Sequence, residues 1–138
     1  MSMFCYQCQE TAKGTGCTIA GVCGKKENTA NLQDLLVFAL KGIAVVAVEA
    51  QKQGKLDNTT GLFICQSLFA TITNANFDDS RITALIKEAF AKRDALKLAT
   101  AFTGTQDCLA WNGSEAEFAA KAKEVGVLSQ PNEDVRSL

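Results

Sequence analysis

Four cysteines lie close together near the start of the chain, at Cys5, Cys8, Cys17 and Cys23. Their spacing is C-x2-C-x8-C-x5-C. Thiolates at such positions are the ligands of structural zinc ions and of iron–sulfur clusters. The first pair, in CYQC, suits chelation of one small centre, and the other two thiols are placed to close the site. The segment therefore predicts a metal centre held by four thiolates.

The unequal spacing bears on which metal is bound. A structural zinc site usually pairs two tight C-x2-C knuckles, and the C-x5-C half is a poor knuckle. A four-iron cubane is larger than a single ion and tolerates uneven spacing. The spacing therefore favours an iron–sulfur cluster over zinc and leaves disulfides or redox thiols as further alternatives. A thioredoxin-like role for CYQC would require a βαβ unit, and no strand-rich segment is predicted.

The composition excludes several functions. The chain has 138 residues, 47% hydrophobic and 21% charged, with a net charge of −1, which fits one globular domain. It lacks the basic stripe of a nucleic-acid binder, and it contains 0 histidines, so histidine-based catalysis is excluded. The most apolar run, Leu35–Val48, contains Lys41 and is too short to cross a bilayer. We expect neither nucleic acid nor membrane as a partner, and a cytoplasmic location.

The hydrophobic pattern predicts an all-α fold. Residues 1–28 are irregular and form a cysteine-rich cluster-binding loop. Apolar residues then recur every three or four positions over about Asn31–Gly54, 59–74 and 79–101, which predicts a three-helix up-down-up bundle within residues 29–102. Residues 103–138 are expected to comprise a loop over 103–113, a short helix over 115–125 and the truncated start of a further helical segment.

Polar residues mark the expected helix starts. Thr29 or Asn31 is predicted to cap the first helix, and Asn58 or Thr59 the second. Caps of the third helix are expected from Asp78, Asp79 and Ser80. Ser114-x-x-Glu117 is a capping box. Asn132 would cap a last helix, yet the chain stops at Leu138. We interpret this as the N-terminal piece of a longer protein.

Several side chains outside the loop have expected roles. The apolar stripe of the second helix is predicted to face the core and includes Leu62, Cys65, Leu68, Phe69 and Ile72. Cys65 is thus expected to be buried, and Cys108 to be an ordinary loop thiol.

On the third helix, Lys87, Glu88, Lys92 and Arg93 are expected to face water, although Arg93 also falls on the predicted apolar face. Trp111 is predicted to anchor packing.

Three stretches resemble a known family: MFCYQCQETAKGTGCTIAGVCGK at the start, TANLQDLL at Thr29–Leu36 and FATITNANFDD at Phe69–Asp79. They are similar to the beginning of the hybrid-cluster proteins, also called prismane proteins or hydroxylamine reductases. NEDVRSL at the end looks like that family's next helical segment, so the resemblance covers essentially the whole chain.

The resemblance implies a role for each of the clustered thiols. Cys5, Cys8, Cys17 and Cys23 match the ligands of the family's proximal iron–sulfur cluster, and their compact spacing is similar to that of members with [4Fe-4S] rather than [2Fe-2S]. It also implies a second, hybrid iron–sulfur–oxygen cluster, whose Cys, His and Glu ligands lie beyond this chain. Hydroxylamine would be reduced there to ammonia and water, and nitric oxide reduction has also been proposed for such proteins.

The expected partners are therefore the rest of the full-length enzyme and a reduced electron-donor protein. The chain alone would transfer electrons without catalysing the reaction, since four thiolates leave its cluster no open position. Two alternatives remain: a free-standing ferredoxin-like carrier and a zinc-stabilised helical binding module.

Overall fold

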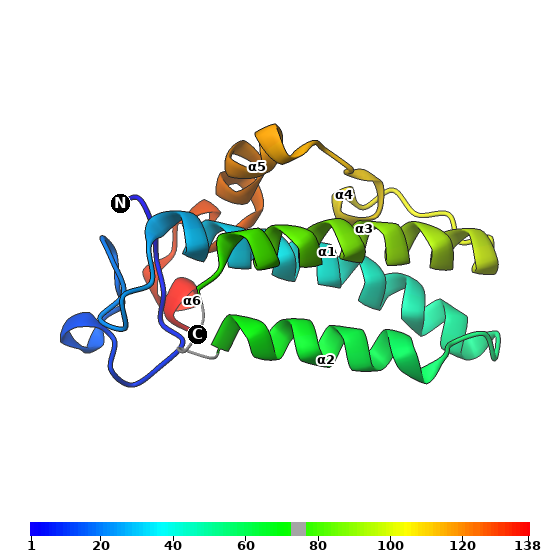
Figure 1. Cartoon of the computed structure of the whole chain (residues 1–138), viewed down its shortest axis with the longest axis horizontal. Helices are drawn as coiled ribbons and strands as arrows, with labels where there is room; N and C mark the ends of the chain where they lie inside the picture. Colours follow the sequence, from blue (N-terminus) through cyan, green and yellow to red (C-terminus); the bar gives the residue numbers. More distant parts are fainter. Residues whose placement is uncertain (73–76) are drawn as a thin grey trace.

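The computed structural model describes residues 1–72 and 77–138. The described residues form helices and no strand, apart from one isolated antiparallel bridge between Cys5 and Cys17. Three long helices, α1 (Glu27–Lys52), α2 (Asn58–Ile72) and α3 (Asp79–Thr100), run in alternating directions along one axis (Figure 1). The all-α prediction is confirmed.

Helix α1 is the centre of the packing. It contacts α3, α2, the short helix α4 (Asp107–Ala110) and α5 (Phe118–Val125). The side chains of Leu35, Leu36 and Ile43 have no exposed area. Each fully buried aliphatic side chain stabilises the fold by about 1.5–3 kcal/mol. The regular apolar pattern of α1 therefore drives the packing of the other helices against it.

Helix α1 is also long and apolar enough to cross a membrane, which corrects the expectation that its apolar run is too short. In the structure 61% of its most apolar window is buried. The core helix of a soluble bundle meets the same criteria of length and composition, and packing against α3, α2 and α5 accounts for the apolar character of α1.

The predicted start and caps of α1 are wrong. The helix begins at Glu27, and Thr29 and Asn31 are buried within its first turns. The Thr29 hydroxyl donates to Asp79 Oδ1 (2.6 Å) and Asn28 donates to Asp79 Oδ2 (2.8 Å). Asn28 and Thr29 therefore connect the start of α1 to the start of α3, and neither Thr29 nor Asn31 caps α1. The predicted stop at Gly54, which has a φ of 68°, is confirmed.

The cap of α2 also differs from the prediction. Asp57 Oδ1 accepts hydrogen bonds from the Thr60 backbone N–H (2.8 Å) and from the Thr59 and Thr60 hydroxyls (2.9 and 2.8 Å). Asp57 therefore caps this helix, in place of Asn58 or Thr59. The last two residues of the predicted helix over 59–74 lie outside the described residues.

The predicted burial of the α2 stripe is wrong. Leu62, Phe69 and Ile72 are 57%, 63% and 55% exposed, and Leu68 and Cys65 are exposed as well. The buried side chains of α2 are Phe63, Ser67 and Thr71. Because α2 is apolar on more than one side, the spacing of apolar residues identifies a stripe without identifying the side that meets the core.

Arg93 is buried, at 1% exposure, and the expectation that it faces water is wrong. Its Nη1 donates to the carbonyl oxygens of Cys108 (3.0 Å) and Trp111 (2.8 Å), and its Nε donates to Asp94 (2.8 Å). The guanidinium thereby fixes residues 103–113 against α3. That segment, predicted as a loop, contains the short helix α4. Lys87 and Glu88 are exposed as predicted.

The packing role of Trp111 is confirmed. Its ring lies 5.5 Å from Phe90, 6.1 Å from Phe118 and 6.4 Å from Phe38, measured between ring centroids. These contacts connect the α4 segment with α1, α3 and α5. Each such aromatic pair stabilises the fold by about 0.5–1.5 kcal/mol, in addition to the hydrophobic stabilisation from the area that it buries.

The chain then closes over the end of the bundle where α1 starts. Glu117 accepts from the backbone N–H and hydroxyl of Ser114 (2.8 Å each), and Asn132 accepts from the Val135 N–H (3.2 Å), so the capping box and the Asn132 cap are confirmed. The last helix, α6 (Glu133–Ser137), lies beside the N-terminal segment (Figure 1).

Candidate metal centre

The cysteine-rich segment covers the end of the bundle where α1 begins. It is irregular apart from one short 3-10 turn, η1 (Ala12–Gly14), and it packs next to α6 (Figure 1). Cys5, Cys8, Cys17 and Cys23 all lie on it. The bundle therefore holds the segment at one end.

Cys5 and Cys17 are brought together. The Cys5 N–H donates to the Cys17 carbonyl oxygen (3.0 Å), and the Cys17 N–H donates to the Cys5 carbonyl oxygen (2.9 Å). Cys17 is buried with Met3 and with Ala30 of α1 in a small apolar cluster. The pair is thus anchored to the first turn of α1.

The sulfur of Cys17 accepts a hydrogen bond from the Ala12 N–H and shares one with the Thr11 hydroxyl, in which either atom can be the donor. The Ala12 N–H lies 3.4 Å from Sγ, and the Thr11 hydroxyl lies 3.6 Å from it. Burial raises the pKa of this thiol, but hydrogen bonds from the Ala12 and Val22 backbone, from Thr11, and the charge of Lys25 outweigh burial and hold the pKa below its usual value. These groups therefore make the thiolate, which is the form that binds a metal, easier to form than in a free cysteine.

Gly16 allows the chain to turn back toward Cys5. Its φ is 109°, and a Cβ atom at this position would lie 2.6 Å from the Phe4 ring. Residues with a side chain rarely adopt this backbone conformation. A side chain at this position would also require a shift of Phe4. The close contact packs Phe4, which is buried, beneath the loop that holds Cys17.

Cys8 and Cys23 are less buried than Cys17. Cys8 is half-buried and Cys23 is exposed. Within the described ranges, no three Cys, Asp or Glu side chains are close enough together to share a single metal ion. The structure thus pairs Cys5 with Cys17 and leaves the four thiols more widely spread than the ligands of a tetrahedral zinc ion. Every cysteine lies among the described residues, and all six are free.

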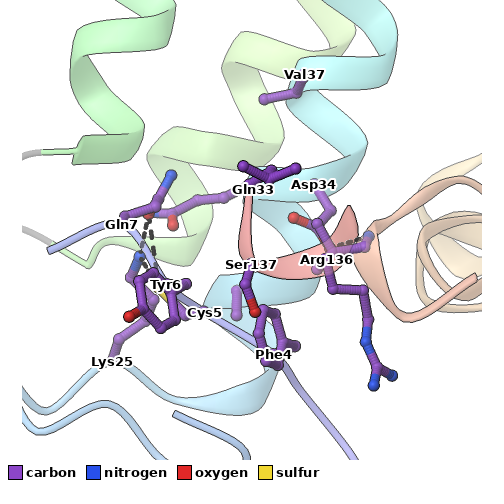
Figure 2. Close-up of a pocket in the computed structure, with 13 residues that line it drawn as sticks. Phe4, Cys5, Tyr6, Gln7, Lys25, Gln33, Asp34, Val37, Arg136 and Ser137 are labelled. Carbon is purple, nitrogen blue, oxygen red and sulfur yellow. Dashed lines mark hydrogen bonds between the residues drawn. The ribbon is translucent and has the colours of Figure 1, made fainter. Parts of the chain in front are cut away.

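Lys25 is a member of the site that the sequence did not reveal. It is 2% exposed, and its Nζ donates to Gln7 Oε1 (2.7 Å) and to Cys5 Sγ (3.5 Å) (Figure 2). In the sequence, the sign that Lys25 belongs to the site was its position two residues after Cys23. The segment GKKE contains two adjacent lysines, however, and Lys26 is exposed, so sequence alone does not tell which one points inward.

A cavity of about 170 Å³ adjoins Cys5 (Figure 2). Asp34 and Gln33 of α1 line it together with Arg136 of α6. Burial raises the pKa of the Asp34 carboxyl to about 6, against the opposing effects of the Val127 N–H and of Lys25. The Gln33 side-chain nitrogen is buried and has no hydrogen-bond partner among the described residues.

The donor set fits an iron–sulfur cluster. Such clusters are held by thiolates, and N–H···S bonds and nearby charge tune them. The segment supplies four thiols, an N–H donor and a hydroxyl partner at Cys17, and an ammonium group at Cys5.

The remaining two cysteines lie outside this segment. Cys65 is exposed on α2, which contradicts its predicted burial, and Cys108 is half-buried on α4.

Comparison with known proteins gives the family. The model of the Prismane/CO dehydrogenase family matches residues 3–138. Over 100% of its length the chain is 52% identical to a hydroxylamine reductase of Desulfitobacterium hafniense, and over 99% it is 50% identical to that of Nitratidesulfovibrio vulgaris. A hydroxylamine reductase of Bacteroides thetaiotaomicron is 51% identical over 100% of the chain.

The match spans 26%, 27% and 25% of these three relatives, so the chain corresponds to about a quarter of their length. The family match covers both the cysteine-rich segment and the helices that position it. The resemblance of the sequence to prismane proteins is confirmed, and the chain belongs to the Prismane/CO dehydrogenase family.

Proposed function

We propose that this chain is the N-terminal iron–sulfur part of a hydroxylamine reductase, with a [4Fe-4S] cluster held by Cys5, Cys8, Cys17 and Cys23. The observation that carries the proposal is the thiolate-favouring environment of Cys17, which is buried and bonded by N–H groups beside Cys5. The names of the relatives support the activity of the longer protein, which reduces hydroxylamine to ammonia and water. Nitric oxide reduction is a second reaction proposed for the same protein.

When bound, the cluster supplies transfer of one electron at a time. The chain's own residues hold and shield it. Cys5 and Cys17 fix one side through their backbone bridge, while Met3 and Phe4, at 0% and 5% exposure, keep water from the inner side. The more exposed Cys23 marks the side open to a reduced electron-donor protein in the cytoplasm.

The chain by itself transfers electrons without reducing hydroxylamine. Four thiolates occupy every iron corner of a cubane, so no iron is open to substrate. The reaction belongs to a hybrid iron–sulfur–oxygen cluster, whose histidine ligand this chain does not contain.

The test compares the isolated chain with the full-length protein under reduced methyl viologen. The chain should accept about one electron and consume no hydroxylamine, while the full-length protein consumes it and loses this activity when Cys17 is replaced by serine. Substantial hydroxylamine reduction by the isolated chain would contradict the electron-transfer role. Unchanged activity of the full-length Cys17→Ser variant would do the same.

A further inference from the structure

Lys25 carries a buried positive charge, and no carboxylate of the described residues forms an ion pair with it. Its side chain is 2% exposed, and its ammonium group contacts Gln7 Oε1, Cys5 Sγ and, at 5.7 Å, the ring of Phe77. None of the ion pairs found within residues 1–72 and 77–138 includes Lys25. A charge removed from water in this way is stable only when a negative group compensates it.

Asp34 supplies that compensation only at longer range. The carboxylate is close enough to feel the charge of Lys25, but it forms no ion pair with it. Its Oδ2 instead accepts the Val127 N–H at 3.0 Å. The group able to carry a negative charge that the ammonium contacts directly is the Cys5 thiol, at 3.5 Å, and the charge of Lys25 also reaches the Cys17 thiol.

We propose that Lys25 is a positioning residue that raises the reduction potential of the cluster bound through Cys5. This inference rests on the proposed iron–sulfur function. Reduction adds one negative charge to the cluster, and a fixed positive charge 3.5 Å from a ligand sulfur favours the more negative state. Gln7 orients the ammonium group toward Cys5 through its 2.7 Å hydrogen bond.

Burial makes this effect specific to Lys25. Salt and water screen the charge of an exposed lysine, but screen a buried one much less. Lys26, the next residue, is exposed, and its replacement changes the net charge by the same amount. The chain thus provides its own matched control.

The test is a redox titration of the cluster, followed by electron paramagnetic resonance, in Lys25→Met, Lys25→Arg and Lys26→Met. Iron and sulfide are measured in each variant, which separates loss of the cluster from a change in its potential. We expect Lys25→Met to lower the equilibrium constant for reduction about tenfold, which is a fall of about 59 mV for one electron. Lys26→Met should change it far less, and Lys25→Arg should keep most of the wild-type potential.

A second variant covers the case in which Lys25→Met does not fold. Gln7→Glu places a carboxylate at hydrogen-bonding distance from the ammonium group and cancels its charge, so it should lower the potential as well. Gln9→Glu, at an exposed neighbouring position, adds the same charge and serves as its control.

The two proposals fail in different ways. A cluster whose potential is shifted no more by Lys25→Met than by Lys26→Met, and no more by Gln7→Glu than by Gln9→Glu, overturns the role of Lys25 alone. A wild-type chain that binds no iron overturns the iron–sulfur function and the role of Lys25 with it.

Discussion

Cys5 and Cys17 face each other across the antiparallel bridge of the N-terminal segment, with N···O distances of 3.0 and 2.9 Å. The bridge makes two of the four proposed ligands a fixed pair, because Cys17 is also buried against Ala30 at the start of α1. The site is therefore only partly preformed. Cys5 and Cys17 are attached to the bundle, whereas Cys8 is half-buried and Cys23 is exposed.

Serine substitutions should divide the six cysteines into two groups. Replacing Cys5, Cys8, Cys17 or Cys23 removes one thiolate ligand, and we expect most of the iron to be lost after anaerobic purification. Cys65→Ser and Cys108→Ser are the controls and should retain iron at the wild-type level. Iron analysis of each variant checks this. Loss of iron from Cys65→Ser, or its retention in all four of the other variants, would contradict the assignment.

Arg93→Met should destabilise the chain by about 2 kcal/mol, since each buried carbonyl that loses its donor costs about 1–3 kcal/mol and these two carbonyls are partly buried. Arg93 donates to the Cys108 and Trp111 carbonyl oxygens, and both would lose that hydrogen bond. Urea unfolding measures the change. Lys87→Met is the control on the same helix, because its ion pair with Glu115 is exposed and should be worth under about 1 kcal/mol. Equal effects of the two substitutions would refute the anchoring role of Arg93.

The two sides of α2 should respond differently to truncation. Phe63 is 8% exposed and Phe69 is 63% exposed. We expect Phe63→Ala to lower the free energy of unfolding by about 3–5 kcal/mol, as for a core phenylalanine, and Phe69→Ala to change it by about 0.5 kcal/mol or less. The opposite order in chemical denaturation would show that the orientation of α2 is wrong.

Asp34 should make stability depend on pH. Burial raises its pKa to about 6 from the ordinary 3.8, so the folded state keeps a proton that the unfolded state releases. The resulting stabilisation, about 3 kcal/mol, is fully present below the ordinary pKa and is lost as pH rises through about 6.

Asp34→Asn does not titrate and should remove this dependence. Urea unfolding of the metal-free, reduced chain at about pH 4 and about pH 8 compares the two proteins. The wild type should lose more stability than Asp34→Asn over this interval. Parallel curves for the two proteins would exclude burial of the Asp34 carboxyl.

The sequence was sufficient for features set by local pattern. The apolar repeat of α1, the Gly54 stop, the Ser114–Glu117 capping box and the Asn132 cap are all present. Each depends on residues within one or two turns of each other, so neighbouring residues decide them.

The features that it missed depend on contacts between distant residues. Arg93 is buried because the Cys108 and Trp111 carbonyls, on another segment, accept its hydrogen bonds. Thr29 bonds to Asp79, fifty positions away, where local propensity predicted a cap. At the candidate site, the thiols were predicted from their type and spacing, but the buried ammonium of Lys25 depends on where Gln7 and Cys5 lie after folding.

Whether the four clustered thiols bind an iron–sulfur cluster can be measured on the chain purified without oxygen. Its iron, zinc and sulfide contents are determined together with its visible spectrum. We expect about four irons and four sulfides per chain, and a brown absorption that bleaches on reduction. A colourless chain that contains one zinc ion and no sulfide would contradict this expectation.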